Sequence, residues 1–318
     1  AIRNAGWSPE DLSRLRVGVC MGTTVGCTMN NEDFYRELRT GGNPDMHPIR
    51  RFLISNPSHS VAGRLNLSGP LQTVVNACCS GTDAIGIGAS WIRHEICDVV
   101  IAGGSDELCR VTYNGFISLM ITDPSPCRPF DQNRKGLNLG EGAGVVVLES
   151  EAIRKKREKA PLAFVLGYGT AGDGFHLTAP KPDGSGLKQA IIQALSFSKT
   201  KRSRVGFISA HGTGTIDNDK VESRILSEVF PKIPFFSTKG HTGHTLGAAG
   251  AIQAVLTLIC LQKQRLPANA GLEIPDPDLP ATPNLCTRDF FSEIAVSQSL
   301  AFGGNNSVLV LQKGGEEK

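Results

Sequence analysis

Short, continuous apolar runs alternate along this chain with segments whose apolar residues recur at helical spacing. Continuous rather than alternating hydrophobicity is typical of strands that are covered on both faces. The runs that we expect to form strands are Val17–Met21, Leu71–Val75, Val99–Ala102, Val145–Leu148, Leu162–Gly167, Val205–Ile208, Ile294–Ser297 and Val308–Leu311. The helical patterns between them are Thr82–Ile96, Gly186–Ser196, Lys220–Val229 and Ala248–Leu261. This alternation predicts a layered α/β protein.

The length of 318 residues exceeds that of a usual single domain. A charged segment, Glu151–Lys159, precedes a fresh apolar run. We therefore expect two similar halves, residues 1–159 and residues 160–318. The first residues read as the interior of a domain, so we also expect that an upstream N-terminal segment is missing.

Composition excludes several classes of function. The formal charge is +3 and the basic residues are dispersed, which argues against nucleic-acid binding. Nine irregularly spaced cysteines predict neither a disulfide framework nor a structural metal site. No apolar run approaches the roughly 20 residues that span a bilayer, and the N-terminus has no signal-peptide pattern. We expect a soluble, cytoplasmic protein without membrane contact.

Cys78 occupies the position expected of a nucleophile. It lies where a predicted strand ends and a predicted helix begins, and Ser80-Gly81 permits a tight turn. A thiol at a helix N-terminus faces free N–H groups and the positive end of the helix dipole, so we expect a lowered pKa. Its own N–H is a possible oxyanion donor. The neighbouring Cys79 is a competing candidate for the nucleophile. Against either cysteine stands the fact that a single cysteine is more often an unreactive, buried packing residue.

Two further glycine-rich loops carry histidine. His211 follows a predicted strand and precedes Gly212-Thr213-Gly214-Thr215, and active-site residues concentrate at such strand ends. His244 lies in the loop before the last predicted helix, with Lys239 and the weaker candidate His241. A cysteine with two distant histidines suggests acyl transfer. We interpret the other four histidines as non-functional: His47, His59, His94 and His176.

A third glycine-rich turn, Phe302-Gly303-Gly304, follows the run at 294–297. By itself it is a weak signal, because paired glycines mark many loops. It could supply a second oxyanion N–H, with the Phe302 ring lining an apolar tunnel.

Taken in order, five segments resemble the β-ketoacyl-acyl-carrier-protein synthases, the elongating condensing enzymes of the thiolase superfamily. The segments are ACCSG, GLNLGEGAG, SAHGTGTIDNDKVE, STKGHTGHTLGAAG and AFGGNN. The resemblance implies a duplicated, five-layered α-β-α-β-α fold. It also implies decarboxylative condensation of an acyl chain, held as a cysteine thioester, with malonyl-acyl-carrier protein in fatty acid or polyketide biosynthesis.

The resemblance also assigns roles to residues. Cys78 is the expected nucleophile, and His211 and His244 bind the malonyl thioester carbonyl and promote decarboxylation. The N–H groups of Cys78 and Phe302 hold the oxyanion, and the Phe302 ring acts as a gate. The resemblance also gives three second-tier assignments. Lys239 is expected to pair with Glu222, and Asn306 to give structural support. Thr213 and Thr215 are expected to hydrogen-bond the pantetheine amides.

The expected partners are an acyl-carrier protein and a second copy of the chain, or else a chain-length partner in a heterodimer. No metal or free cofactor is expected, because phosphopantetheine carries the substrates. Three alternatives remain open: a non-catalytic chain-length-factor-like subunit, an inactive truncated synthase, and a thiolase or starter-type synthase that uses coenzyme A. Cys78 with both histidines argues against the first alternative, and Lys239 with His244 argues against the last.

Overall fold

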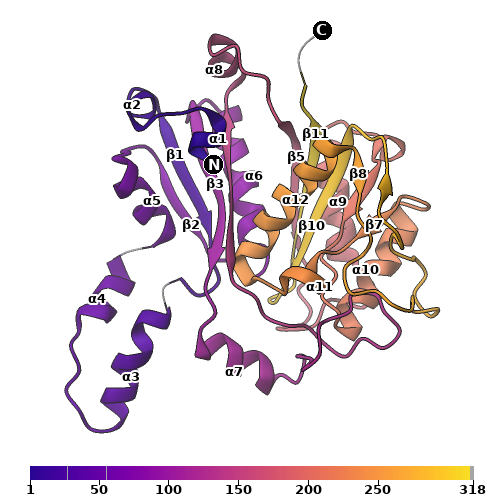
Figure 1. The fold of residues 1–318 in the computed structure, drawn as a ribbon, viewed down its shortest axis with the longest axis horizontal. Helices are drawn as coiled ribbons and strands as arrows, with labels where there is room; N and C mark the ends of the chain where they lie inside the picture. Colours follow the sequence, from indigo (N-terminus) through magenta and orange to yellow (C-terminus); the bar gives the residue numbers. More distant parts are fainter. Residues whose placement is uncertain (27, 55, 316–318) are drawn as a thin grey trace.

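The computed structural model describes residues 1–26, 28–54 and 56–315. Two sheets form the framework (Figure 1). The first has the strand order β2-β1-β3-β4 and the second has the order β5-β11-β10-β6-β7. The strands of the first sheet are β1 (Val17–Gly22), β2 (Leu71–Val74), β3 (Val99–Asp106) and β4 (Gly142–Glu149). Those of the second are β5 (Ala163–Gly172), β6 (Phe207–Ser209), β7 (Phe235–Phe236), β10 (Ile294–Ala301) and β11 (Asn305–Lys313).

Helices cover the sheets and separate them. The two central helices are α6 (Ser80–Arg93) and α12 (Ala249–Lys263), which lie between the sheets (Figure 1). The outer layers are α5 (Pro57–Leu65) on the first sheet, and α9 (Ser185–Phe197) with α10 (Ile216–Val229) on the second. This order confirms the predicted five-layered α-β-α-β-α fold.

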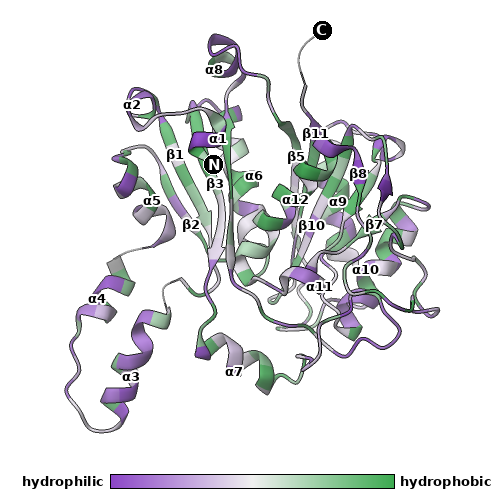
Figure 2. Cartoon of the chain, in the orientation of Figure 1, coloured by the Kyte–Doolittle hydropathy of each residue, from purple (hydrophilic) through white to green (hydrophobic). Residues whose placement is uncertain are grey.

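The remaining helices are short and mostly peripheral. They are α1 (Ile2–Ala5), α2 (Pro9–Leu12), α3 (Glu32–Arg39), α4 (His47–Ile54), α7 (Arg110–Ser118), α8 (Glu151–Lys156) and α11 (Lys239–Thr242). Within the described residues, the other elements are three 3₁₀ turns, Thr28–Asn31, Arg202–Arg204 and Leu246–Ala248, and the hairpin of β8 (Arg265–Leu266) and β9 (Arg288–Asp289). Hydrophilic residues gather on outer helices such as α3 and α8 (Figure 2).

Each strand divides its side chains between two apolar layers. Val19 of β1 packs toward α5, whereas its neighbour Cys20 packs toward the central helices. In β11, Val308 faces α9 and Leu309 faces the central helices. Both faces of each sheet are therefore covered, which explains the continuous apolar runs. The two sheets come from residues 17–149 and 163–313, and the division at 159/160 into two domains stays a prediction.

No continuous apolar run in the sequence is long enough to span a bilayer, but one helical segment of the structure is long enough. Leu246–Lys263 would suffice, by length and composition, to cross a membrane. It contains α12, whose residues Ala251, Ala254 and Leu261 pack in the core between the two sheets. Its hydrophobicity is therefore explained by burial within the protein.

The central helices approach closely at their N-terminal ends. A Cβ on Gly81 of α6 would lie 2.8 Å from the backbone nitrogen of Ala251 in α12. A Cβ on Gly250 would collide with the hydroxyl of Thr82. Glycine at these two positions thus lets the two helix backbones pack almost in contact.

Replacing Gly250 by alanine should lower the free energy of unfolding by about 1–3 kcal/mol, because the added methyl group forces the helices apart. The control is Gly63→Ala in α5, where a Cβ meets nothing within 4 Å. That change should leave stability unchanged or raise it by up to about 1 kcal/mol. Urea unfolding followed by circular dichroism measures both variants, and equal stabilities would contradict the proposed crowding.

Candidate active site

A sharp turn places Cys78 at the entrance of α6. β2 ends at Val74, and Ala77 adopts the left-handed conformation with φ 45°. The Ser80 hydroxyl accepts a hydrogen bond from the Asn76 N–H at 2.8 Å and donates one to the Ala77 carbonyl at 2.6 Å. These bonds hold the strained backbone in place. The strand–turn–helix arrangement predicted for the nucleophile is therefore present.

Cys78 is buried beside an imidazole. Its side chain is 5 % exposed, and its sulfur lies 3.0 Å from Nε2 of His244. The backbone N–H groups of Phe302 and of Cys78 itself also stabilise the thiolate form. Two donors from separate loops thus converge where an oxyanion would form during acyl transfer.

The expectation of a lowered thiol pKa is wrong. Burial raises the pKa of Cys78 to about 11. The charge of Lys239 and the N–H groups of Phe302 and Cys78 lower the pKa, but their effect is smaller than that of burial. Removal from water disfavours a thiolate more than the helix terminus favours it, so the resting group is a neutral thiol.

Cys79 points away from this site. Its side chain is fully buried, and its sulfur contacts the carbonyl oxygens of Ser299 at 3.3 Å and Asn305 at 3.4 Å. It does not line the cavity around Cys78. The geometry therefore favours Cys78 over Cys79 as the nucleophile.

The rings of His211 and His244 contact each other beside the Cys78 thiol. His211 follows β6 and His244 follows α11, and their ring centroids are 5.2 Å apart with an interplanar angle of 84°. Both rings are almost completely buried. Burial, and then the positive charge of Lys239, hold the pKa of each imidazole well below its usual range. Both rings are consequently neutral at physiological pH.

Their hydrogen-bond partners define the tautomers. The Leu246 N–H donates to Nδ1 of His244 at 3.2 Å, and Nζ of Lys239 lies 3.3 Å from Nδ1 of His211. With Nδ1 accepting, each neutral ring carries its proton on Nε2. Nε2 therefore acts as a hydrogen-bond donor.

This tautomer also bears on metal binding. Cys78, His211 and His244 place one potential ligand atom each within 4.8 Å of the others. A metal-ligating imidazole normally donates its second N–H to an acceptor, which frees the other nitrogen for the metal. Here the second nitrogens face donors, so the cluster suits an oxyanion better than a cation.

Lys239 is buried under His211. Its Nζ lies 2.5 Å from the His211 carbonyl oxygen and 3.4 Å from Oε1 of Gln253. Together with Nδ1 of His211, three acceptors match the three donors of an ammonium group. Burial lowers the pKa of Lys239 to about 8, opposed most strongly by the negative charge of Glu222.

Glu222 organises the loop that carries His211. Its carboxylate accepts hydrogen bonds from the N–H groups of His211 at 2.6 Å and Gly212 at 2.7 Å, and from the Gln298 amide at 2.7 Å. Its hydrogen bonds within the described residues do not include Lys239. The expected pair is therefore a longer-range interaction between charges, with the His211 loop between them.

The predicted polar wall and gate lie on the same cavity. The hydroxyls of Thr213 and Thr215 are 2.8 Å apart. The Phe302 ring stacks on Phe116 with centroids 5.4 Å apart. Asn306 lies outside the cavity lining and donates to Asp173 Oδ1 at 2.9 Å, which ties the turn after Phe302 to the neighbouring loop.

A cavity of about 230 Å³ joins these groups. Its lining residues are Cys78, Phe116, Met120, Ile121, Lys135, Leu137, Thr178, Pro180, His211, Thr213, Thr215, Ile216, Asp217, Asn218, His244, Leu300, Ala301 and Phe302. Cys78 and the histidines are buried, whereas Met120, Lys135 and Asp217 are exposed. The cavity therefore runs from an outer rim to the thiol.

Several supporting residues escaped the sequence analysis. Gln253, Gln298 and Phe116 lie in α12, β10 and α7, and no glycine-rich loop or strand end marks them. His241 is exposed on α11 and does not line the cavity. It therefore loses its place as a candidate.

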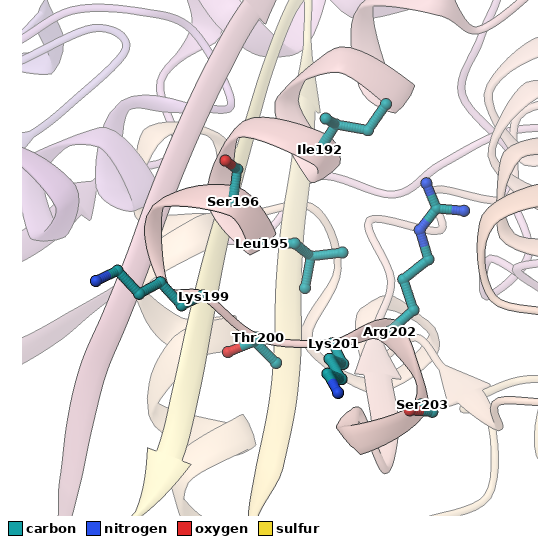
Figure 3. Close-up of a pocket in the computed structure, with 8 residues that line it drawn as sticks. All are labelled: Ile192, Leu195, Ser196, Lys199, Thr200, Lys201, Arg202 and Ser203. Carbon is teal, nitrogen blue, oxygen red and sulfur yellow. The ribbon is translucent and has the colours of Figure 1, made fainter.

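A second, open groove of about 560 Å³ lies at the C-terminal end of α9. It contains Lys199, Lys201 and Arg202, and the side chains of Lys199 and Arg202 point in different directions (Figure 3). None of its lining residues belongs to the cavity around Cys78. We interpret this groove as a solvated basic surface.

The fold and the site together define a condensing enzyme of the thiolase superfamily. The chain matches the beta-ketoacyl synthase N-terminal domain over residues 1–152 and the C-terminal domain over residues 162–273. It belongs to the beta-ketoacyl synthase family. This membership confirms the predicted class of enzyme, an acyltransferase that performs the condensation of fatty acid or polyketide biosynthesis.

Individual relatives agree with this assignment. The chain is 34% identical to "3-oxoacyl-[acyl-carrier-protein] synthase 2" of Rhizobium meliloti (strain 1021), over 98% of the chain and 78% of the relative. It is 33% identical to the "Tetracenomycin polyketide synthase ketoacyl synthase alpha subunit" of Streptomyces glaucescens, with the same two coverages. "The ishigamide ketosynthase/chain length factor" superposes with a TM-score of 0.94 at 33% identity, over 99% of this chain and 79% of that one.

The rate at which iodoacetamide alkylates Cys78 should rise about tenfold per pH unit between roughly pH 7 and pH 10, because only the thiolate reacts. The raised pKa, about 11, places the plateau beyond this range. Mass spectrometry of the peptide containing Cys78 measures the rate, with the exposed Cys286 as an internal reference for reagent access. A plateau near neutral pH would show instead that the pKa of Cys78 is lowered.

Proposed function

We propose that Cys78 accepts the acyl chain from the phosphopantetheine arm of an acyl-carrier protein. The sulfur attacks the thioester carbonyl, a new C–S bond forms, and the pantetheine sulfur leaves with the proton that Cys78 gives up. His244 Nε2, 3.0 Å away, donates toward the developing thiolate. The N–H groups of Cys78 and Phe302 stabilise the oxyanion of the tetrahedral intermediate.

The second half-reaction uses the histidine pair. Malonyl-carrier protein loses carbon dioxide, and the electron pair of the broken C–C bond passes into an enolate. Two neutral imidazoles with Nε2–H donors bind the enolate oxygen more tightly than the ground-state carbonyl. The carbanion then attacks the Cys78 thioester, the 3-oxoacyl product stays on the carrier, and the released thiolate takes up a proton.

One observation carries this proposal: Cys78 and both histidines border a single cavity, with Cys78 and His244 in contact. Lys239 keeps His211 in the donor tautomer, and Glu222 holds the His211 loop. Thr213 and Thr215 offer hydroxyls to the amides of the pantetheine arm. The chemistry needs no redox or nucleotide cofactor, because the substrates arrive as activated thioesters.

Replacing Cys78 by alanine should abolish transfer of the acyl group to the protein and spare malonyl decarboxylation, since the histidine donors remain. His211→Ala or His244→Ala should slow decarboxylation by roughly 10²–10³-fold, the usual loss for one oxyanion donor. Acylation is followed by mass spectrometry of the intact protein, and decarboxylation by carbon dioxide release.

The exposed His241 provides the matched control, and His241→Ala should keep both half-reactions. Retained acylation in the Cys78 variant would reassign the nucleophile. Wild-type decarboxylation in both histidine variants would remove their proposed role. A wild-type protein that is not acylated on Cys78 would instead favour the alternative of a non-catalytic, chain-length-factor-like subunit. The structural neighbours include ketosynthase/chain length factor pairs, which is why this alternative is tested.

We also propose that two copies of this chain assemble as a homodimer. β2 lies at the edge of the first sheet, and Val75 immediately after it is 68% exposed. α3 and α4 form an arm, residues 32–54, that extends away from the sheets (Figure 1). The arm exposes large apolar side chains: Tyr35, Leu38, Met46, Phe52 and Leu53. Exposed apolar surface beside an unpaired strand edge is typical of a protein–protein interface.

Leu53→Glu should shift the protein from dimer to monomer in analytical ultracentrifugation, because Leu53 is 75% exposed on the arm and a charge there opposes burial. Phe291→Glu is the control, since Phe291 is 87% exposed but lies outside the arm. A monomeric wild-type protein, or a dimer that both variants retain, would contradict this interface.

We place the reaction in the cytoplasm. Every cysteine that the structure describes is a free thiol, and a thiol nucleophile suits a reducing compartment. Similar proteins include bacterial synthases and a mitochondrial one from Schizosaccharomyces pombe. Cell fractionation with an antibody to the chain tests this location, because the protein should appear in the cytoplasmic fraction and not in an organelle fraction.

A further inference from the structure

A buried carboxylate lies directly behind the nucleophile turn. Asp83 is in the first turn of α6 and is 4% exposed. One of its oxygens accepts from the Asn76 side-chain amide at 2.6 Å. The other accepts from the Tyr168 hydroxyl at 2.8 Å and from the Ser307 hydroxyl. The proposed mechanism uses neither Asp83 nor these partners.

These partners come from opposite sides of the central layer. Asn76 begins the turn that carries Cys78, after the first sheet. Tyr168 and Ser307 belong to β5 and β11, neighbouring strands of the second sheet. Asp83 therefore links the nucleophile turn to the sheet across from it.

Two further contacts strengthen the same link. The Thr82 and Ser299 hydroxyls are 2.8 Å apart, and the Cys79 sulfur contacts the Ser299 carbonyl at 3.3 Å. Ser299 lies in β10, which pairs with β11 up to Ala301 opposite Asn305. Residues 79, 82 and 83 thus clamp the start of α6 onto the β10–β11 hairpin.

The turn of that hairpin contains Phe302. Its N–H and that of Cys78 are the two proposed oxyanion donors, and they belong to different sides of the clamp. The spacing of the two donors therefore depends on how α6 is seated on the hairpin. A donor displaced by about 1 Å loses most of its catalytic effect.

We propose that Asp83 is a positioning residue for acyl transfer, which fixes the separation of the Cys78 and Phe302 N–H groups by joining the nucleophile turn to β5 and β11. This inference rests on the proposed function. All three of its hydrogen bonds need an acceptor at Asp83. An asparagine there keeps the size of the side chain but removes its negative charge and turns one acceptor oxygen into a donor, so one of the three partners must reorient or lose its hydrogen bond.

Asp83→Asn should slow acylation of Cys78 by roughly ten- to a hundredfold. Decarboxylation of malonyl-carrier protein should fall far less, because it depends on His211 and His244. Single-turnover acylation by mass spectrometry and carbon dioxide release measure the two steps on the full chain.

The stability control is Ser58→Ala. Ser58 is fully buried and its hydroxyl accepts from the Met21 N–H, on the outer side of the first sheet and away from the clamp. Ser58→Ala should destabilise the fold without separating the two half-reactions. If Asp83→Asn slows both steps in proportion to its loss of folded protein, or slows neither, Asp83 has no positioning role.

A spectroscopic measurement tests the link without using activity. Burial, reinforced by the charge of Asp83, raises the pKa of Tyr168. Asp83→Asn should lower the pKa of Tyr168, observed as phenolate absorbance and assigned with Tyr168→Phe. An unchanged titration would overturn the contact. Failure of the wild-type protein to acylate Cys78 at all would instead overturn the proposed function, so the two failures are distinguishable.

Discussion

The close packing of α6 against α12 is the constraint on which the active site depends. Glycines 81 and 250 let the two helices approach between the sheets. Cys78 lies just before Cys79, the N-cap of α6, and His244 precedes the turn that leads into α12. Bringing the two helix entrances together therefore brings the sulfur and Nε2 of His244 to 3.0 Å. A larger side chain at either glycine would move the Cys78 thiol away from the His244 ring.

Burial then decides the charges of the site. Removal from water raises the pKa of the thiol to about 11 and lowers that of both imidazoles, so all three reactive groups rest in their neutral forms. In such a poorly hydrated cavity, fixed N–H donors act strongly on charge that develops during the reaction. A neutral resting site with preorganised donors is consistent with both half-reactions, since each one creates a negatively charged oxygen.

The sequence predicted the framework better than the periphery. The apolar runs mark most of the strands because both faces of each sheet are covered, as β1 and β11 illustrate. The run at 205–208 predicted a strand two residues too early. β6 begins at Phe207, because the Val205 N–H donates back to the Arg202 carbonyl and so closes the 3₁₀ turn before the strand. The arm formed by α3 and α4 was missed, since α3 is short and mostly polar and buries none of its side chains in the core.

By itself, the sequence determined which residues stand at the strand ends and glycine-rich turns: Cys78, His211, His244 and Phe302. Local backbone chemistry suffices for this, since a nucleophile or a close turn leaves its mark within a few neighbouring residues. Only the tertiary structure decided that these loops share one cavity, that Glu222 binds the His211 loop and that the thiol pKa is raised. Burial and hydrogen-bond partners come from residues far away along the chain, so no local pattern contains them.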